Sequence, residues 1–189
     1  CIIDIKNDKQ ITKVDLRDCM YISIVNCPKI TRIPSISHFI NLETLKLQHC
    51  DIKVFDMHIP DCLRNLEISY CGLQEFRPQN TPQNLAELNL SFNKLKLIPR
   101  CLERLPAATS IDLKNNDFWF NMYSDISPAM ILPDSVDELI LAHKQNLLGT
   151  SKILYAINIL QEKEHFDSAR ALQRATKVQF EVRKKEVQT

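Results

Sequence analysis

A repeat of about 22 residues runs through the middle of the chain and constrains its fold more than any other feature. Its units share the spacing L-x-x-L-x-L-x-x-N/C-x-L-x-x-L, in which isoleucine or phenylalanine also fills apolar positions. Three consecutive units carry it at Leu42, Leu45, Leu47, Cys50, Ile52, Phe55; at Leu63, Leu66, Ile68, Cys71, Leu73, Phe76; and at Leu85, Leu88, Leu90, Asn93, Leu95, Ile98. A weaker fourth unit follows at Ala108, Ile111, Leu113, Asn116, Phe118. Such a period is typical of a solenoid, in which each unit buries its apolar face against the next.

The alternating leucines of each unit predict a short strand with one face turned inward. The full spacing resembles that of the leucine-rich repeat family. The resemblance implies an α/β solenoid with a parallel β-sheet on its concave face, short extended or 3₁₀ segments on its convex face, and helices only near the C-terminus. It also implies that the Asn or Cys side chain of each unit bonds backbone groups of the neighbouring turn. These positions, called here the Asn and Cys column, are Cys27, Cys50, Cys71, Asn93 and Asn116. Cys27, Cys50 and Cys71 are therefore expected to be buried, and close to all seven cysteines to be free thiols.

Prolines recur at a fixed place in the repeat. Pro60, Pro82 and Pro133 each stand eight residues before a central strand position, and proline cannot donate to a helix ladder, so the return segments are expected to be extended or 3₁₀. This feature resembles the short repeats of secreted bacterial effectors and of large-DNA-virus proteins. Some such effectors carry a cysteine-dependent ubiquitin-ligase domain after the repeats, but no cysteine follows Cys101 in this sequence.

The two ends of the repeat array depart from the regular spacing. An earlier unit runs from Cys19 through Cys27, and its two-residue gap after Cys27 resembles the cysteine-containing repeat subtype. Two registers are open before it: a strand around Ile3–Ile5, or a strand at Val14–Leu16 with Cys19 in the turn.

After Phe118 the period breaks, and the aromatic run 118–123 is expected to plug the open end of the core, since terminal repeats have no neighbour to cover them. The next strand is predicted at Leu139–Leu141. We thus divide the chain into a solenoid over residues 1–148, with regular units at about 19–120 and a capping unit at 121–148, and a helical extension over 149–189. Helical spacing predicts two antiparallel helices there, the first capped by Ser151 and the second starting at Asp167 or Ser168.

A stripe of aromatic residues is predicted on the sheet. His49, Tyr70 and Phe92 occupy equivalent positions in three successive units, and parallel strands lie about 4.8 Å apart, so their rings should adjoin. The resemblance implies that partners bind this concave face, and we select Tyr70, Phe92 and His49 first as partner-binding residues. The flanking strand positions Lys46, Glu67 and Asn89 come next. The alternative is that the rings only cover the sheet edge or pack on one another.

Composition and motifs argue against several classes of function. Only two glycines occur, Gly72 and Gly149, too far apart for a phosphate-binding loop. A net charge of +1 gives no broad positive field for nucleic acid. No apolar run has the roughly 18–20 residues of a membrane span, and the histidines and cysteines show no catalytic or metal-ligand spacing. We therefore predict no enzyme activity, no cofactor and no metal.

The sequence as a whole predicts a protein-recognition module that acts without catalysis. Free thiols favour an intracellular, cytoplasmic location, which would be the host cytoplasm for an effector or viral protein. Two other roles are open: the substrate-recognition part of a larger enzyme such as a ubiquitin ligase, or an assembly or adaptor protein that self-associates through its C-terminal helices.

Overall fold

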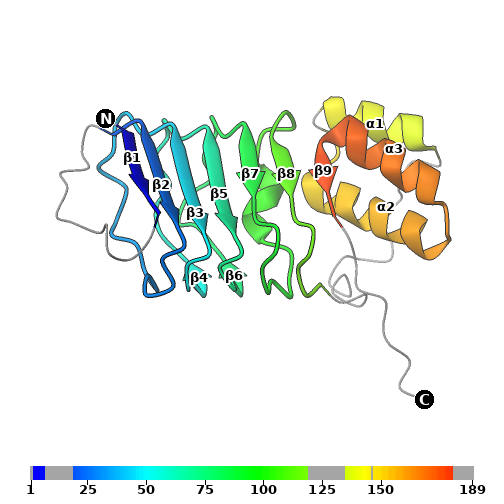
Figure 1. Cartoon of the computed structure of the whole chain (residues 1–189). Helices are drawn as coiled ribbons and strands as arrows, with labels where there is room; N and C mark the ends of the chain where they lie inside the picture. The colour runs from blue at the N-terminus through cyan, green and yellow to red at the C-terminus, as the bar shows by residue number, and fades with distance from the viewer. Residues whose placement is uncertain (1, 7–18, 119–134, 146, 181–189) are drawn as a thin grey trace, which may run out of the picture.

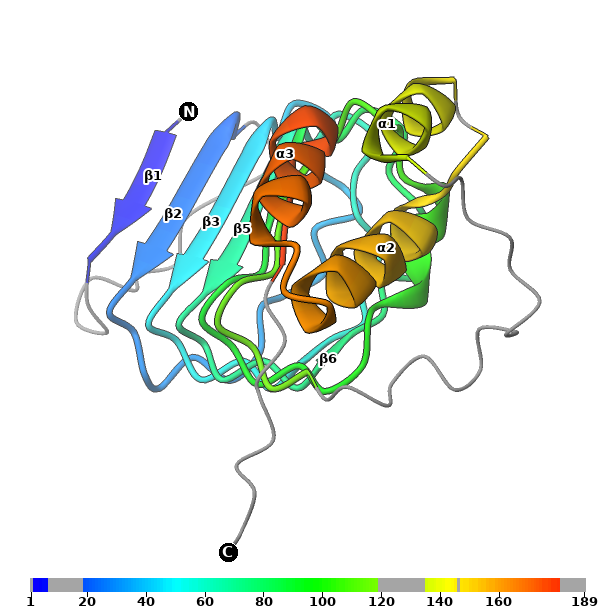
Figure 2. The ribbon, with the colours of Figure 1, turned by 90° about the vertical axis from the view of Figure 1, so that its right-hand side faces the viewer.

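A single sheet of seven parallel strands forms one side of the molecule (Figure 1). The computed structural model describes residues 2–6, 19–118, 135–145 and 147–180. The strands lie in the order β1 (Ile2–Ile5), β2 (Tyr21–Val25), β3 (Thr44–Gln48), β5 (Asn65–Ser69), β7 (Glu87–Asn89), β8 (Ser110–Asp112), β9 (Val178–Gln179). Viewed along the row of strands, the chain winds through similar turns that enclose the core (Figure 2). The predicted parallel-stranded solenoid is confirmed.

The repeated leucines set the register of the sheet. Leu45 pairs with Leu66, Leu66 with Leu88, and Leu88 with Ile111, and each of these side chains is at most 1% exposed. Each unit thus buries the same apolar position against the next, as the spacing requires.

The register also confirms the first of the two N-terminal alternatives. Ile3 pairs with Ile22, so the strand at Ile3–Ile5 is the direct neighbour of β2. The alternative strand at Val14–Leu16 falls on residues outside the described part of the chain.

The return segments are extended or 3₁₀, as the prolines predict. Two short strands, β4 (Val54–Phe55) and β6 (Glu75–Phe76), form a small parallel sheet beyond the carboxyl ends of the main strands, below them in the view of Figure 1. The buried rings of Phe55 and Phe76 stack with their centroids 5.3 Å apart. The next unit carries a 3₁₀ helix, η2, at Arg100–Arg104.

The asparagine of the repeat connects two units through its amide. Asn93 donates from Nδ2 to the carbonyls of Ile68 (2.6 Å) and Leu90 (3.0 Å). Its Oδ1 accepts the backbone N–H groups of Cys71 (3.1 Å) and Leu73 (3.0 Å). An amide serves here because it both donates and accepts, so one side chain satisfies the buried backbone of two turns.

The cysteines of the column are buried thiols, whereas a cysteine outside the column departs from the free-thiol prediction. Cys27, Cys50 and Cys71 are buried and form no disulfide. A hydrogen bond from the Cys50 side chain holds the pKa of the Cys71 thiol below its usual value, against burial, which raises it. Cys19, however, is disulfide-bonded. The expectation of free thiols is wrong there because disulfide pairing depends on distances in the fold that residue spacing does not supply.

The prediction of a strand at Leu139–Leu141 is wrong, because these residues belong to helix α1 (Val136–Lys144). Ser135 caps this helix, its side chain accepting the backbone N–H of Glu138 at 3.2 Å. Leu139 is buried, whereas Leu141 is 55% exposed, so the apolar positions follow a helical face rather than strand alternation. His143, in the last turn of the same helix, is also buried.

Two further helices and a returning strand close the solenoid. The predicted pair is present as α2 (Thr150–Glu162) and α3 (Phe166–Thr176), with Gly149 rather than Ser151 as the first N-cap. Both helices lie at the β8 end of the sheet (Figures 1 and 2). After α3 the chain returns as β9, which contains Val178 and pairs parallel with β8.

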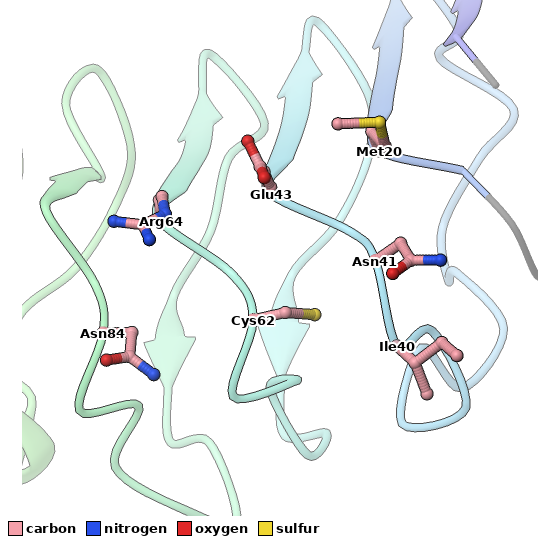
Figure 3. A pocket seen from close by; sticks show the side chains of 7 residues that line it. All are labelled: Met20, Ile40, Asn41, Glu43, Cys62, Arg64 and Asn84. Carbon is pink, nitrogen blue, oxygen red and sulfur yellow. The ribbon is translucent and has the colours of Figure 1, made fainter.

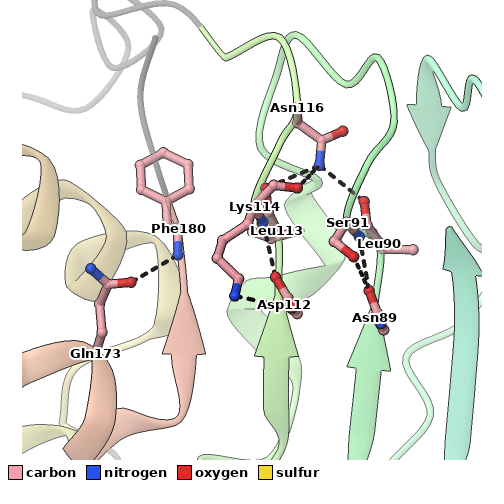
Figure 4. A network of polar contacts seen from close by, with 9 residues as sticks. All are labelled: Asn89, Leu90, Ser91, Asp112, Leu113, Lys114, Asn116, Gln173 and Phe180. Atoms are coloured by element: carbon pink, nitrogen blue, oxygen red, sulfur yellow. Dashed lines mark hydrogen bonds and ion pairs between the residues drawn. The ribbon is translucent and has the colours of Figure 1, made fainter. Parts of the chain in front are cut away.

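The end of the core is filled by aromatic packing. Phe118 is fully buried, as expected of the first residue of the predicted aromatic plug, and its ring contacts that of Phe180 at 5.2 Å. The remaining plug residues, 119–123, lie outside the described residues. Backbone N–H of Phe180 donates to Gln173 Oε1 at 3.0 Å (Figure 4), which ties the end of β9 to α3.

Candidate functional site

Three aromatic rings form a continuous stack at the carboxyl ends of β3, β5 and β7. His49 and Tyr70 stack with centroids 4.7 Å apart, and Tyr70 and Phe92 with centroids 4.3 Å apart. Tyr70 and Phe92 keep 44% and 42% of their surface exposed. The stripe expected from the repeat is thus a column of rings in contact, called here the aromatic stack.

All three residues of the aromatic stack have a left-handed backbone. Their φ angles are 51°, 55° and 54° for His49, Tyr70 and Phe92. The equivalent residues of the flanking units, Asn26 and Asn115, have φ angles of 57° and 54°. Asparagine tolerates this conformation, whereas a bulky side chain there is an outlier. The fold therefore demands a left-handed residue at this position in each of these units, and two of them fill it with the bulky residues Tyr70 and Phe92, whereas histidine, like asparagine, is enriched in this conformation.

Stacking energy alone gives a weak reason for aromatic residues at these positions. A left-handed non-glycine residue costs roughly 1–2 kcal/mol, whereas an aromatic pair contributes about 0.5–1.5 kcal/mol beyond its buried area. The two stacking contacts therefore contribute about 1–3 kcal/mol, against roughly 3–6 kcal/mol for the left-handed backbone at three residues. The surrounding backbone enforces the geometry: Phe92 N–H donates to the Lys114 carbonyl at 2.9 Å.

The middle ring of the stack presents its edge, not its faces, to a partner. Tyr70 lies between His49 and Phe92, at interplanar angles of 23° and 11°, so both of its faces are covered. Ring edges carry the positive end of the aromatic quadrupole. The exposed surface therefore favours carbonyl oxygens or an aromatic face of a partner over a cationic group.

A row of polar residues crosses the same sheet beside the stack. Lys46, Glu67 and Asn89 are register partners on β3, β5 and β7, and each alternates with buried leucines or isoleucines along its strand. Lys46 Nζ lies 3.4 Å from Glu67 Oε2. Glu67 also accepts from Ser69 Oγ at 2.8 Å. These three residues form the polar row.

Asn89 is held in place by its own strand. Its Oδ1 accepts from Ser91 Oγ at 2.6 Å and from Ser91 N–H at 2.9 Å (Figure 4). On β8, Asp112 is the register partner of Asn89 and extends the line of the polar row. The Asp112 carboxylate accepts the backbone N–H of Lys114 at 3.0 Å. Asp112 was not among the residues selected from the sequence, although it stands in the same column of the repeat.

The structure thus brings all six selected residues together, three on neighbouring strands of one sheet and three just beyond the carboxyl ends of the same strands. What the sequence reasoning missed was the left-handed backbone under the rings. The signal for it was present, because asparagine fills the same position at Asn26 and Asn115, and asparagine is enriched in that conformation.

A second concavity lies at the opposite, amino-terminal edge of the sheet (Figure 3). It has a volume of about 490 Å³ and is lined by Met20, Ile40, Asn41, Glu43, Cys62, Arg64 and Asn84. Its lining mixes both charges with exposed apolar side chains, and the Cys62 thiol already donates to the Phe39 carbonyl at 3.3 Å. The lining contains no paired acid and base for catalysis.

Metal and nucleophile chemistry gain no support from the residues that the structure describes. Within them, no three histidine, cysteine or acidic side chains are grouped to hold a metal ion. Burial raises the pKa of the Cys101 thiol to about 12, so the thiol stays protonated and is a poor nucleophile at neutral pH. No helix in the described ranges has the length and apolarity to cross a membrane.

Comparison with known proteins agrees with the geometry. Residues 61–118 match the leucine rich repeat family model, a segment that contains β5, β6, β7, η2 and β8. No curated protein and no solved structure matches the chain. The register of the strands and the Asn and Cys column agree with this match: the chain forms a parallel-stranded solenoid, and its segment 61–118 matches the leucine rich repeat family.

Proposed function

We propose that this chain is a recognition protein that binds a protein partner on its concave sheet face without catalysing a reaction. Leucine-rich repeat domains generally mediate protein–protein interaction. The observation that carries the proposal for this chain is the aromatic stack, whose residues His49, Tyr70 and Phe92 adopt a left-handed backbone while remaining exposed.

Strained backbone is retained where the surrounding structure enforces it and a function benefits from it. Asparagine at these positions would meet the backbone requirement at lower cost, as it does at Asn26 and Asn115. Contiguous exposed aromatic surface, in turn, is the feature that most often dominates binding energy at an interface. Binding therefore supplies a stronger reason for the aromatic side chains than stacking energy alone.

The polar row supports the same surface. Its side chains are already bonded to one another or to their own strands, as in the pair of Lys46 with Glu67 and of Asn89 with Ser91. Few rotamers need to be fixed when a partner arrives, which lowers the entropy lost on binding. The expected partner presents a carbonyl-rich or aromatic surface to the stack and polar groups to Lys46, Glu67 and Asn89.

The double variant Tyr70→Asn/Phe92→Asn tests the proposal. Asparagine suits the left-handed backbone, so the free energy of unfolding of the variant should lie within about 1 kcal/mol of the wild-type value, although both large rings are gone. Affinity capture from cells that express each protein, with quantitative mass spectrometry, should show at least one protein partner lost from the variant. Direct titration of that partner should show a drop in affinity of at least about tenfold.

The matched control is Ile40→Asn/Leu147→Asn. It replaces two apolar side chains that are 75% and 71% exposed and lie outside the stack, and it should keep the partner. If the stack variant and the control retain the same partners with equal affinity, the aromatic stack is not a binding surface.

Self-association through the C-terminal helices stays the alternative. Four apolar residues of these helices, Ile153, Leu154, Ile157 and Leu172, are fully buried in the chain's own core and are not available for it. The intracellular location stays a prediction: five cysteines that form no disulfide are consistent with it, and the disulfide at Cys19 is the opposing observation.

A further inference from the structure

The small sheet of β4 and β6 ends at β6 with an open edge. Between β4 and β6, Arg77 N–H donates to the Phe55 carbonyl at 2.9 Å, and Glu75 N–H to the Lys53 carbonyl at 3.2 Å. One repeat later, the residues equivalent to Glu75 and Arg77 are Leu97 and Pro99, whose backbone N–H groups would be the next donors. Proline has no N–H, and across the described residues no backbone hydrogen bond joins 96–99 to β6. The third strand of this sheet is therefore missing.

A groove occupies the place of the missing strand. It has a volume of about 700 Å³ and lies between Gln74–Arg77 on one wall and Lys94–Arg100 on the other. A second cavity of about 410 Å³ shares Phe76, Arg77 and Arg100 with it and extends the groove to Arg104.

The walls of this groove carry an excess of positive charge. Its basic side chains are Arg77, Lys94, Lys96, Arg100 and Arg104, and all belong to exposed residues. Its acidic residues are Glu75 and Asp117. Glu75 Oε2 is already paired with Arg77 Nη1 at 3.2 Å. The excess is local, because the whole chain has a net charge of only +1.

An apolar contact lies in the middle of the basic walls. Leu97 lines the groove beside the basic residues Lys96 and Arg100, and its side chain is 70% exposed. A purely electrostatic anion site has no use for an exposed leucine, whereas a peptide side chain can pack on it.

We propose that this groove binds an extended acidic segment of a partner protein. The segment pairs its backbone with the open edge of β6, sets carboxylates against Lys96 and Arg100, and packs one apolar side chain on Leu97. Addition of a strand to an open edge gives affinity through main-chain hydrogen bonds and specificity through side chains. This surface is separate from the aromatic stack, since β6 and the main sheet lie on different sides of the coil (Figure 2).

The backbone edge favours a peptide over a nucleic acid. A phosphate chain would use the lysines and arginines but could neither continue the sheet at β6 nor pack on Leu97. Single-stranded nucleic acid also requires aromatic platforms for its bases, and the only aromatic residue that lines the groove, Phe76, is 5% exposed.

Selection from a phage library of random dodecapeptides on the purified full chain tests the proposal. Selected peptides should be enriched in aspartate and glutamate and contain an apolar residue. The variant Lys96→Glu/Arg100→Glu should bind the strongest synthetic peptide at least about tenfold more weakly in fluorescence anisotropy. The control Lys29→Glu/Arg32→Glu makes the same charge change at exposed residues outside the groove and should bind as the wild type does.

Two further measurements separate peptide pairing from simple charge attraction. The same peptide with N-methyl groups on alternate backbone nitrogens should lose at least about tenfold in affinity, because it cannot donate to the β6 edge. Polyphosphate and oligothymidylate should compete only weakly. Absence of acidic enrichment, equal binding by both charge variants, or equal binding of the N-methylated peptide would each overturn the proposal. Thermal unfolding of each variant confirms that the comparison is made between folded proteins.

Discussion

At the scale of the residue, the Asn and Cys column shows two solutions to one problem. Asn93 accepts the buried N–H groups of Cys71 and Leu73 and donates to carbonyls of two units. Cys71, one unit earlier, donates only a thiol hydrogen, to the Ser69 carbonyl at 3.2 Å and to the Leu47 carbonyl at 3.5 Å. The thiol is the weaker donor, so the two residue types should contribute unequally to stability.

We expect Asn93→Ala to lower the free energy of unfolding by about 3 kcal/mol, because two buried N–H groups lose their acceptor. Asn93→Cys should lose less, since a thiol can donate to the same carbonyls, as Cys71 does one unit earlier. Urea unfolding monitored by circular dichroism measures both. Equal losses for the two variants, or a loss below about 1 kcal/mol for Asn93→Ala, would contradict this account of the column.

The aromatic stack also belongs to this scale, and it marks the limit of what the repeat could predict. Spacing alone places His49, Tyr70 and Phe92 in one column, because parallel strands bring equivalent positions side by side. The ring orientation and the left-handed backbone depend on where each strand stops and turns. Those details follow from three-dimensional packing, and they are what distinguish ring edges from ring faces as the exposed surface.

At the scale of the element, sequence reasoning succeeded where neighbours repeat and failed where they do not. The strands from β2 to β8 lie where the repeat places them. The stretch Leu139–Leu141 was assigned to a strand because it continues the leucine spacing, yet it folds as α1. At the end of an array no following unit accepts a strand's hydrogen bonds, so local signals such as the Ser135 cap determine the structure.

Strand β9 was missed for a related reason. It contains only Val178 and Gln179, too short for strand alternation to be recognised, and it forms because α3 returns the chain to the free edge of β8. Lys177 ends α3 in a left-handed conformation with φ of 56°. Covering the last strand in this way protects an edge that would otherwise be open to aggregation.

We expect Phe180 to be the residue that secures this closing strand. It is fully buried, contacts Phe118 and is bonded to Gln173, so Phe180→Ala should lower the free energy of unfolding by about 3–5 kcal/mol. The matched control Phe166→Ala, at a residue that is 44% exposed, should lose under about 1 kcal/mol. Chemical unfolding compares the two, and equal losses would show that β9 is not an integral part of the sheet.

At the scale of the whole molecule, solenoid and helices share one hydrophobic core. Buried side chains run without interruption from Ile3 in β1 to Leu154 in α2 and Phe180 beyond β9. A repeat array with contacts only between neighbours can unfold from its ends. Here the terminal helices are bound into the same core as the strands, so the chain should behave as one cooperative unit rather than as a solenoid with an independent helical domain.

The variant Leu154→Ala tests that cooperativity. Leu154 is fully buried in α2, and its truncation should lower stability by about 2–5 kcal/mol. If the core is one unit, circular dichroism of the helices and hydrogen exchange of β3 and β5 should report the same loss, since a single transition affects all probes equally. Leu47→Ala, at a fully buried residue of β3, is the reciprocal test and should destabilise α2 and α3 as much as the strands. If Leu154→Ala instead releases the helices while exchange in β3 stays at its wild-type rate, the helices form a separate folding unit.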